Sequence, residues 1–524
     1  DIDETTYLFA VGGLGFAPGQ MGPSTSQTPY LISTTPGVSF GSILTAGESV
    51  NGYKMCGTPD GIGAFDNNDG TFTMVMNHEF GNTAGVTRAH GSAGAFVSKW
   101  VINKSNLSVV SGSDLIKNVN LWNGTGYTTY NATNPSTKAA FNRFCSADLP
   151  AVSAFYNSNT GKGTKERLFM NGEEAGTEGR GFAHIVTGSN AGTSYELPFL
   201  GKFSMENLLA CPIESDKTIV AGTDDATPGQ VYFYIGTKSS TGNEIEKAGL
   251  VGGKLFGPSV TGLATEASGS APAPDLTFTM VDLGVVKDST GVAINKMSDA
   301  KSVTAFLRPE DGVWDPNSKG DFYFVTTNSI LAPSRLWRMR FSDINNPEKG
   351  GTITALLDGT EGQKMFDNIT IDNSGHLILL EDVGSNVHNG KVWEYTIATD
   401  ALRLIGQHDP SRFEKSGANF LTIDEESSGV IDAQSILGPG MFLLVDQAHY
   451  AIAGEVVEGG QILTMYNQVT FNGLPEISVS GNNVDITDGS LTAQSADNTH
   501  VGNVALGDAV MVKYAIKNNK AGEI

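Results

Sequence analysis

Positively charged residues are scarce in this sequence. It has 33 Lys and Arg against 56 Asp and Glu, which gives a formal net charge of −23 and an isoelectric point near 4.7. Non-specific binding to nucleic acid needs a basic surface, so this charge excludes nucleic acid as a partner. The same charge is typical of secreted proteins with an acidic surface, and it favours association with divalent cations.

Cysteines are few and long apolar runs are missing. The chain of 524 residues holds only Cys56, Cys145 and Cys211, and this odd number excludes a disulfide framework. No window of about 18 consecutive apolar residues occurs, so we expect no transmembrane segment. The chain begins at Asp1 without a Met or an apolar signal core, as expected if a targeting peptide has been removed.

Two common catalytic motifs are also absent. The sequence contains no P-loop and no H-E-x-x-H pair. P-loop nucleotide-binding and zinc protease chemistry therefore have no basis in the sequence.

What the sequence does contain is a repeated strand pattern. Gly accounts for 64 residues and charged residues for only 17%, which is typical of short strands and many turns. Apolar runs end in acidic or polar residues at Glu79, Glu173 and Glu174, Asp224 and Asp225, Asn328, Glu381 and Asp382, and Asp446 with His449. Strands so far apart in sequence converge only in a radial fold, so we predict an all-β propeller whose inner strands end around one channel.

The length fits a propeller with an appended module. We predict an irregular entry segment over residues 1–50, because it is rich in Gly, Pro, Ser and Thr. The propeller is expected over residues 51–465. A partial β-sandwich-like module is expected over residues 470–524, where strand-like runs alternate with Gly, Asn and Asp turns.

The acids at the strand ends are candidate metal ligands. Calcium takes roughly six to eight oxygen ligands, more than any one loop here supplies, so carboxylates from several blades are needed. Clustered carboxylates without a cation repel one another. For Glu79, a turn cap or a solvated carboxylate is an equally good interpretation.

Cys145 and Arg308 are candidates for a chemical role. Cys145 follows Arg143 among polar residues, and a thiolate near a cation or metal is stabilised, although a lone cysteine is more often an inert buried residue. Arg308, in FLRPEDGVWDP, can hold two phosphate oxygens in a fork, or it can form a salt bridge with Glu310 or Asp311.

The order of the motifs carries a family resemblance. The motifs are, in order, TPDG, NHE, HG, a Cys-containing loop, GEE, GKFSMEN, GTDD, RPED and FDNITIDNSGHLILLED. Their order in this chain resembles that of the PhoX-type alkaline phosphatases and their wider family of metal-dependent propellers. The sequence resembles that family over about residues 40–460. The resemblance implies a six-bladed β-propeller with insertions, secreted or periplasmic, that hydrolyses phosphomonoesters with a site built from iron and calcium.

The resemblance also implies roles for single residues. The iron-ligating thiolate falls on Cys145, and further metal-ligating glutamates fall on Glu206 and Glu310. The arginine that meets the phosphate falls on Arg308, so Arg308 and Glu310 are the expected catalytic residues. The implied calcium ligands are Glu174, Asp225, Asp367, Asn368, Glu381 and Asp382, and Glu79 is added from its strand-end position.

The chain departs from the family pattern near these residues. Gly172 stands before the GEE acids where the family has Cys, and Met205 stands before Glu206 where the family has His. The Gly-rich, Trp-containing run that follows the family's iron-binding cysteine is absent after Cys145. These changes bear on the identity of the metal and leave calcium alone as an alternative.

A second resemblance concerns the end of the chain. From about residue 474, PEISVSGNNVDITDG and VKYAIKNN resemble the beginning of a choice-of-anchor D module, an immunoglobulin-like sandwich of bacterial surface and secreted proteins. A sandwich needs roughly 100 residues, so we expect it to continue beyond Ile524 or to be completed by another chain. The resemblance implies surface attachment or self-association.

Three functions follow from these observations. The first is a secreted, periplasmic or cell-surface phosphomonoesterase with calcium and iron as cofactors. The second is a noncatalytic, calcium-stabilised propeller for adhesion or filament formation, and the third is a calcium-dependent lactonase-like hydrolase that needs no cysteine ligand. Cys145, Glu206, Glu310 and Arg308 are all present, which favours the phosphomonoesterase.

Overall fold

A computed structural model describes residues 19–269, 271–470, 477–486, 493–503 and 510–518. The chain divides into two compact units, residues 1–468 and residues 469–524. Among the described residues, no helix is both long enough and apolar enough to cross a membrane.

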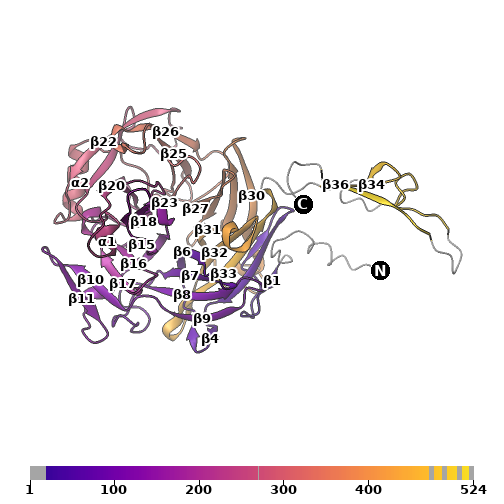
Figure 1. Cartoon of the computed structure of the whole chain (residues 1–524), viewed down its shortest axis with the longest axis horizontal. Coiled ribbons are helices and arrows are strands. Elements are labelled where there is room, and N and C mark those ends of the chain that lie inside the picture. Colours follow the sequence, from indigo (N-terminus) through magenta and orange to yellow (C-terminus); the bar gives the residue numbers. More distant parts are fainter. Residues whose placement is uncertain (1–18, 270, 471–476, 487–492, 504–509, 519–524) are drawn as a thin grey trace. The chain divides into compact units, whose positions relative to one another are not determined.

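The larger unit is a β-propeller, in which antiparallel sheets are arranged around one axis (Figure 1). The first sheet runs outward from the axis in chain order, through β6 (Pro59–Asp66), β7 (Thr71–His78), β8 (Phe96–Asn103) and β9 (Val109–Asp114). Within the described residues, six strands lie innermost: β6, β12 (Phe144–Asp148), β18 (Met205–Ala210), β23 (Pro309–Trp314), β27 (Phe366–Ile371) and β31 (Glu425–Asp432). Each contacts the next, and β31 contacts β6, so these strands form a closed ring.

The other strands extend the sheets outward. The second sheet adds β15 (Leu168–Glu173), β16 (Gly181–Ile185), β17 (Thr193–Glu196), β10 (Asn118–Trp122) and β11 (Tyr127–Asn131). A larger sheet joins β18, β19 (Lys217–Asp224), β20 (Val231–Thr237) and β21 (Lys254–Val260) through β22 (Leu276–Gly284) to β26 (Gly351–Leu357), β25 (Arg335–Phe341), β24 (Asp321–Thr326) and β23. The next sheet consists of β27, β28 (His376–Glu381), β29 (Lys391–Thr396), β30 (Ala401–His408) and β2 (Leu31–Ser33). The last sheet consists of β31, β32 (Met441–Ile452), β33 (Val457–Asn467), β3 (Val38–Thr45) and β1 (Gln20–Met21).

Helices and short hairpins connect these sheets. The α-helices are α1 (Glu244–Lys247), α2 (Gly291–Ala300), α3 (Pro410–Phe413) and α4 (Gln434–Leu437). The 3₁₀ helices are η2 (Thr137–Ala139), η3 (Val152–Ala154), η4 (Pro198–Leu200), η5 (Pro347–Lys349), η6 (Gly454–Val456) and η7 (Gln468–Thr470). The hairpins pair β4 (Ser49–Val50) with β5 (Tyr53–Lys54), and β13 (Tyr156–Asn157) with β14 (Lys162–Gly163).

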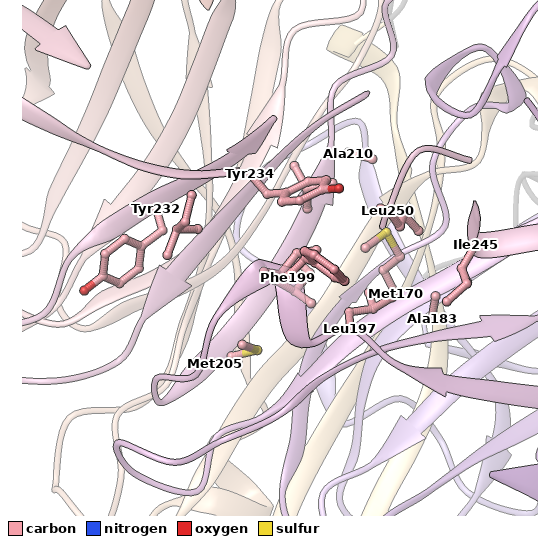
Figure 2. Close-up of a cluster of buried hydrophobic side chains, with 14 of the residues drawn as sticks. Met170, Ala183, Leu197, Phe199, Met205, Ala210, Tyr232, Tyr234, Ile245 and Leu250 are labelled. Carbon is pink, nitrogen blue, oxygen red and sulfur yellow. The ribbon is translucent and has the colours of Figure 1, made fainter. Parts of the chain in front are cut away.

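Apolar side chains fill the spaces between neighbouring sheets. Figure 2 shows one such cluster, in which Met170 of β15 and Ala183 of β16 pack with Met205 of β18 and Tyr232 of β20. Burying a large apolar side chain stabilises the fold by roughly 1.5–3 kcal/mol. Because both faces of an innermost strand are covered, strands such as β27 are buried at every position.

The prediction of an irregular entry segment over residues 1–50 is wrong for its described part. β3 is antiparallel to β33 from Val38 opposite Asn467 to Thr45 opposite Gln461, and β2 pairs with β30. A strand from the start of the chain therefore completes the sheet formed by its end, and the propeller is larger than residues 51–465. The run VSFGSILT was missed because half of its residues are Ser, Gly or Thr, the composition that led us to expect an irregular segment.

The smaller unit contains a three-stranded antiparallel sheet in its described residues. β34 (Ile477–Gly481) lies between β35 (Val484–Ile486) and β36 (Tyr514–Asn518). Much of the segment from 470 to 524 lies outside the described residues, and the immunoglobulin-like module stays a prediction.

The pairing of β3 with β33 leads to a prediction about the stability of the propeller. Phe40 of β3 is buried against β30 and β33, so Phe40→Ala should lower the free energy of unfolding by about 3 kcal/mol. Urea unfolding followed by circular dichroism measures this change. The control Val110→Ala, on the exposed side of β9, should change it by less than about 0.5 kcal/mol. Equal effects of the two substitutions would show that β3 does not hold the ring closed.

Candidate metal centre

The second residue of every innermost strand is an acid or the cysteine. These residues are Asp60, Cys145, Glu206, Glu310, Asp367 and Glu426. All six are buried. Because the inner strands form a ring, equivalent positions in them lie around the axis at the same end of the propeller.

A shared backbone geometry directs these side chains. Each innermost strand shifts its register against its neighbour directly after or around this position, which is the mark of a β-bulge. The residue before four of the strands has a positive φ: 39° at Thr58, 49° at Arg143, 55° at Arg308 and 47° at Met365. The strands also approach closely here, since a Cβ at Gly61 would lie 2.1 Å from the backbone nitrogen of Ala147.

The second strand of several sheets adds another acid at the same end. Because β7 is antiparallel to β6, its last residue, His78, lies opposite Pro59 and Glu79 follows beside Asp60. The same pairing brings Glu174 to the start of β12 and Asp382 to the start of β27. Three of the strand ends predicted from the sequence, Glu79, Glu174 and Asp382, therefore meet at one place. The other predicted strand-end residues are outside the ligand groups described below: Glu173, Asp224, Asp225, Asn328, Glu381, Asp446 and His449.

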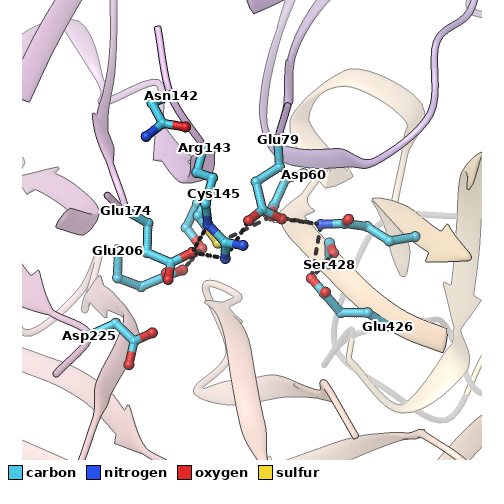
Figure 3. Close-up of polar contacts among 12 residues, drawn as sticks. Asp60, Glu79, Asn142, Arg143, Cys145, Glu174, Glu206, Asp225, Glu426 and Ser428 are labelled. Carbon is cyan, nitrogen blue, oxygen red and sulfur yellow. Dashed lines mark hydrogen bonds and ion pairs between the residues drawn. The ribbon is translucent and has the colours of Figure 1, made fainter. Parts of the chain in front are cut away.

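The ligand atoms form overlapping groups, in each of which they lie within 4.8 Å of one another. The groups are Asp60–Glu79–Cys145, Cys145–Glu174–Glu206, Glu206–Glu310–Asp367 and Asp367–Asp382–Glu426. Gln447 joins the two ends, since its Nε2 donates to Asp60 Oδ2 at 3.0 Å and to Glu426 Oε1 at 3.1 Å. We call this arrangement the acid ring, and Figure 3 shows part of it.

Two arginines neutralise part of the acid ring. Arg143 Nη2 lies 2.7 Å from Glu79 Oε1 and also pairs with Glu174. Arg308 Nη2 lies 2.9 Å from Glu310 Oε1, and its Nε and Nη2 contact the two oxygens of Asp225 at 2.7 and 3.1 Å. The predicted ligand Asp225 is thus held by an arginine at the edge of the ring.

Burial and mutual repulsion hold protons on the acid ring. Burial raises the pKa of Glu206 to about 8 and that of Glu174 to about 9, and neighbouring carboxylates add to both shifts. The pKa values of Asp60, Glu310 and Asp367 lie well above the ordinary range for the same reasons. Burial, followed by the charge of Asp60, also raises the pKa of the Cys145 thiol. Bound cations would reverse these shifts, because they stabilise the charged forms.

The donor atoms fit metal cations. Three buried oxygens at or beside the acid ring, Asp60 Oδ1, Asn368 Oδ1 and Gln447 Oε1, have no hydrogen-bond partner among the described residues. Such orphaned oxygens, together with many carboxylates, match the hard ligands of calcium. The single sulfur of Cys145 among carboxylates suits a transition metal such as iron.

The predicted ligands divide into two sets. The structure brings Cys145, Glu206, Glu310, Glu174, Glu79 and Asp367 together in the acid ring. Glu381 lies outside these groups, where its carboxylate accepts hydrogen bonds from Trp393 Nε1 and Lys364 N at 2.8 Å and contacts His388. Its neighbour Asp382 joins the ring instead.

Sequence reasoning missed Glu426 and Gln447. Glu426 begins EESSGVID, which has no apolar run at its start, so it did not resemble the other strands. The sequence feature that could have identified Glu426 is its position, since it precedes small residues at the start of a strand, as Asp60 and Cys145 do. Gln447 carries no charge and lies within β32, so it does not belong to the pattern of acids at strand ends.

The fold and the site define a β-propeller with a buried cluster of carboxylates and one thiol at one end of its axis. The structure is similar to that of PhoX from Pseudomonas fluorescens in complex with vanadate, a transition state analogue, with a TM-score of 0.58 and 12% sequence identity over 87% of this chain and 98% of that chain. Two further structures are more distantly similar. Chaetomium thermophilum Sqt1, bound to the N-terminus of the ribosomal protein L10, has a TM-score of 0.36 and 8% sequence identity over 80% of this chain and 98% of that chain. The β-propeller domain of the Trilobed protease from Pyrococcus furiosus has a TM-score of 0.31 and 7% sequence identity over 78% of this chain and 94% of that chain. No family model matches the sequence, and a search of curated proteins found no significant match. The similarity to PhoX confirms the β-propeller fold.

The acid ring predicts an unusual pH dependence of stability without metal. Glu206 and Glu174 bind protons more tightly in the folded than in the unfolded state, so raising the pH from about 4.5 to about 9 should lower the free energy of unfolding, by about 2 kcal/mol or more. Excess calcium should abolish the fall, because the cation replaces the protons. Urea unfolding across this range, with chelator or with calcium, measures both.

Glu206→Gln is the matched variant for this experiment. It removes one group with a raised pKa, so the fall measured in chelator should become smaller. A pH dependence that is the same with chelator and with calcium would contradict the assignment of the acid ring as a cation site.

Proposed function

We propose that this protein is a PhoX-like phosphomonoesterase with a calcium and iron cluster in its acid ring. The observation that carries the proposal is the continuity of the ring, in which Cys145 shares a group with Glu206 and Glu206 shares a group with Glu310. Arg308 contacts Glu310 at 2.9 Å. These four residues are the ones to which the family resemblance assigns the iron ligands and the phosphate-binding arginine.

The donor types divide the ring between two kinds of cation. Cys145, Glu206 and Glu310 would hold iron, because Cys145 supplies a sulfur ligand and the family resemblance assigns the iron ligands to these three residues. Glu79, Glu174, Asp367, Asp382 and Glu426 would hold calcium through their carboxylate oxygens. The bound cations would supply neutralisation of the phosphoryl oxygens during an in-line displacement.

Arg308 would orient the phosphate. Its Nε and Nη2 are engaged by Asp225 and Glu310, so the guanidinium is fixed, while its Nη1 has no hydrogen-bond partner among the described residues. The side chain is 30% exposed, which leaves that edge accessible to a ligand. A fixed, planar donor next to the acid ring can hold a phosphoryl oxygen in one orientation.

Glu310 would restrict the movement of Arg308. Its carboxylate is buried and lies between the arginine and the other acids of the ring. When cations occupy the ring, Glu310 would bind both a cation and the guanidinium, so the positions of metal and phosphate would be coupled through one side chain.

A calcium-stabilised propeller without catalysis is the second candidate. The group Asp367–Asp382–Glu426 contains only carboxylates and suits calcium alone. The ion pairs of Arg308 with Asp225 and Glu310 also fit a purely structural role. A lactonase-like hydrolase would use the same acids without Cys145, so the cysteine separates it from the phosphomonoesterase.

The proposal also covers the location of the protein. The acidic net charge and the family resemblance support a secreted, periplasmic or cell-surface protein. Surface attachment or self-association through the smaller unit is proposed from its resemblance to a choice-of-anchor D module.

Removal of the thiol tests the iron assignment. Cys145→Ala should lose bound iron and phosphate release from 4-nitrophenyl phosphate together, while calcium binding and the circular dichroism spectrum persist. Cys211→Ala, at another buried cysteine remote from the ring, should retain both metals and activity. Undiminished turnover by Cys145→Ala with calcium alone would remove iron from the mechanism.

Replacement of Arg308 tests its role towards phosphate. Arg308→Lys should raise KM for 4-nitrophenyl phosphate and the inhibition constant of inorganic phosphate, each about tenfold, because an ammonium cannot reproduce the guanidinium fork. Arg340→Lys is the matched control, since Arg340 forms a similar two-contact pair with Asp321 away from the ring. Unchanged phosphate inhibition in Arg308→Lys would indicate a structural salt bridge instead.

A further inference from the structure

We propose that a groove beside the acid ring binds the alcohol part of the substrate and selects phosphate esters whose alcohol carries a second anionic group. The inference rests on the proposed function and deepens it. The groove has a volume of about 640 Å³, which suits a small organic ligand, and its walls include the β10–β11 hairpin and η2.

The groove adjoins the acid ring through two stretches of chain. Asn142 lines the groove, and the next residue, Arg143, pairs with ring acids. Glu173 also lines the groove, and the next residue, Glu174, belongs to the ring. The backbone nitrogen of Asn142 donates to Glu173 Oε1 at 3.1 Å, so the two stretches are held together at the boundary.

Arg143 stands at this boundary with part of its guanidinium available. Its Nε and Nη2 contact Glu174, and Nη2 also contacts Glu79, whereas Nη1 has no hydrogen-bond partner among the described residues. The side chain is 49% exposed. Figure 3 shows Asn142, Arg143 and Glu174 at this edge of the ring. An ester bound in the ring would therefore pass a cationic group on its way into the groove.

The charges in the groove sum to a positive surplus. Arg180 and Glu173 neutralise each other through two contacts of 2.7 Å. Glu196 accepts a hydrogen bond from the backbone nitrogen of Trp122 at 2.9 Å; burial raises its pKa, and the charges of Arg180 and Lys202 oppose this shift. Two further cations remain in the lining, Lys138 and Lys202. The lining thus holds three cationic side chains against two acids.

Neither lysine is strongly paired. Lys138 forms no ion pair with the described residues, and Lys202 Nζ lies 4.0 Å from Glu178, an exposed residue outside the groove lining. Weakly paired ammonium groups in the lining of a groove attract an anion. With the scissile phosphate in the ring, a second phosphate on the same alcohol would lie near these lysines. We therefore assign bisphosphate esters as the preferred substrate class.

The reaction itself is ordinary hydrolysis. The ester P–O bond breaks, water supplies the new oxygen on the phosphate, and a proton from that water ends on the released alcohol. The second phosphate stays on the alcohol and leaves with it, so the groove contributes to binding alone.

The test compares one alcohol with and without its second anion. The substrates are propane-1,3-diyl bisphosphate and 3-hydroxypropyl phosphate, and the readout is kcat/KM for phosphate release by the metal-loaded full chain. The wild type should prefer the bisphosphate about tenfold or more. The variant Lys138→Glu/Lys202→Glu should lose this preference, because its KM for the bisphosphate should rise more than its KM for the monophosphate.

Lys349→Glu is the control. This exposed lysine lies in the turn between β25 and β26, at the opposite end of its sheet from Glu310, and its reversal should leave the preference unchanged. Equal kcat/KM for the two esters in the wild type, or an equal loss for both in the groove variant, would overturn the inference.

A binding measurement separates this inference from the proposed function. If neither ester is hydrolysed, the phosphomonoesterase proposal fails, and calorimetry with the same two esters still decides the groove. Tighter binding of the bisphosphate by the wild type, but not by Lys138→Glu/Lys202→Glu, would support the subsite. Identical affinities would refute it.

Discussion

Repulsion among buried carboxylates is the constraint on which the rest of this structure depends. The fold removes acids such as Asp60, Glu206 and Glu310 from water and sets them within a few ångströms of one another. Only protons, arginines or metal cations can compensate for such a concentration of charge. Arg143 and Arg308 do so in part, and both stand at the edge of the ring. The remaining charge makes the ring a receptor for cations.

The propeller builds this receptor by repetition. A residue in the left-handed region, a strand start and a bulge recur around the axis, so a single local geometry delivers a ligand from each sheet. Variation of one residue type within that geometry then changes the chemistry. Cys145 adds the one sulfur, and Gln447 supplies a neutral bridge between Asp60 and Glu426. The groove beside Arg143 exists because the second sheet carries the additional β10–β11 hairpin.

Much of this arrangement could be predicted from the sequence, and the failures have physical causes. Apolar runs that end in acids predicted the radial all-β fold, because antiparallel pairing returns each second strand to the start of an inner strand. The entry strand β3 was missed because half of its residues are Ser, Gly or Thr, which resemble a loop in sequence although all of them are buried. Glu381 was expected to bind metal as its neighbour Asp382 was, since only coordinates show that Glu381 accepts a hydrogen bond from Trp393. Glu426 could have been predicted only by recognising that an acid or a cysteine recurs at the second position of the innermost strands.

The pairing of β3 with β33 has a consequence for how the protein becomes functional. Glu426 and Gln447 lie on β31 and β32, in the sheet that β3 completes, so the ring of ligands is finished only when the two ends of the larger unit have met. A nascent chain emerging from the ribosome or from a membrane pore would hold the early ligands without the late ones. Cation capture is therefore expected only after the whole of the larger unit has emerged and folded.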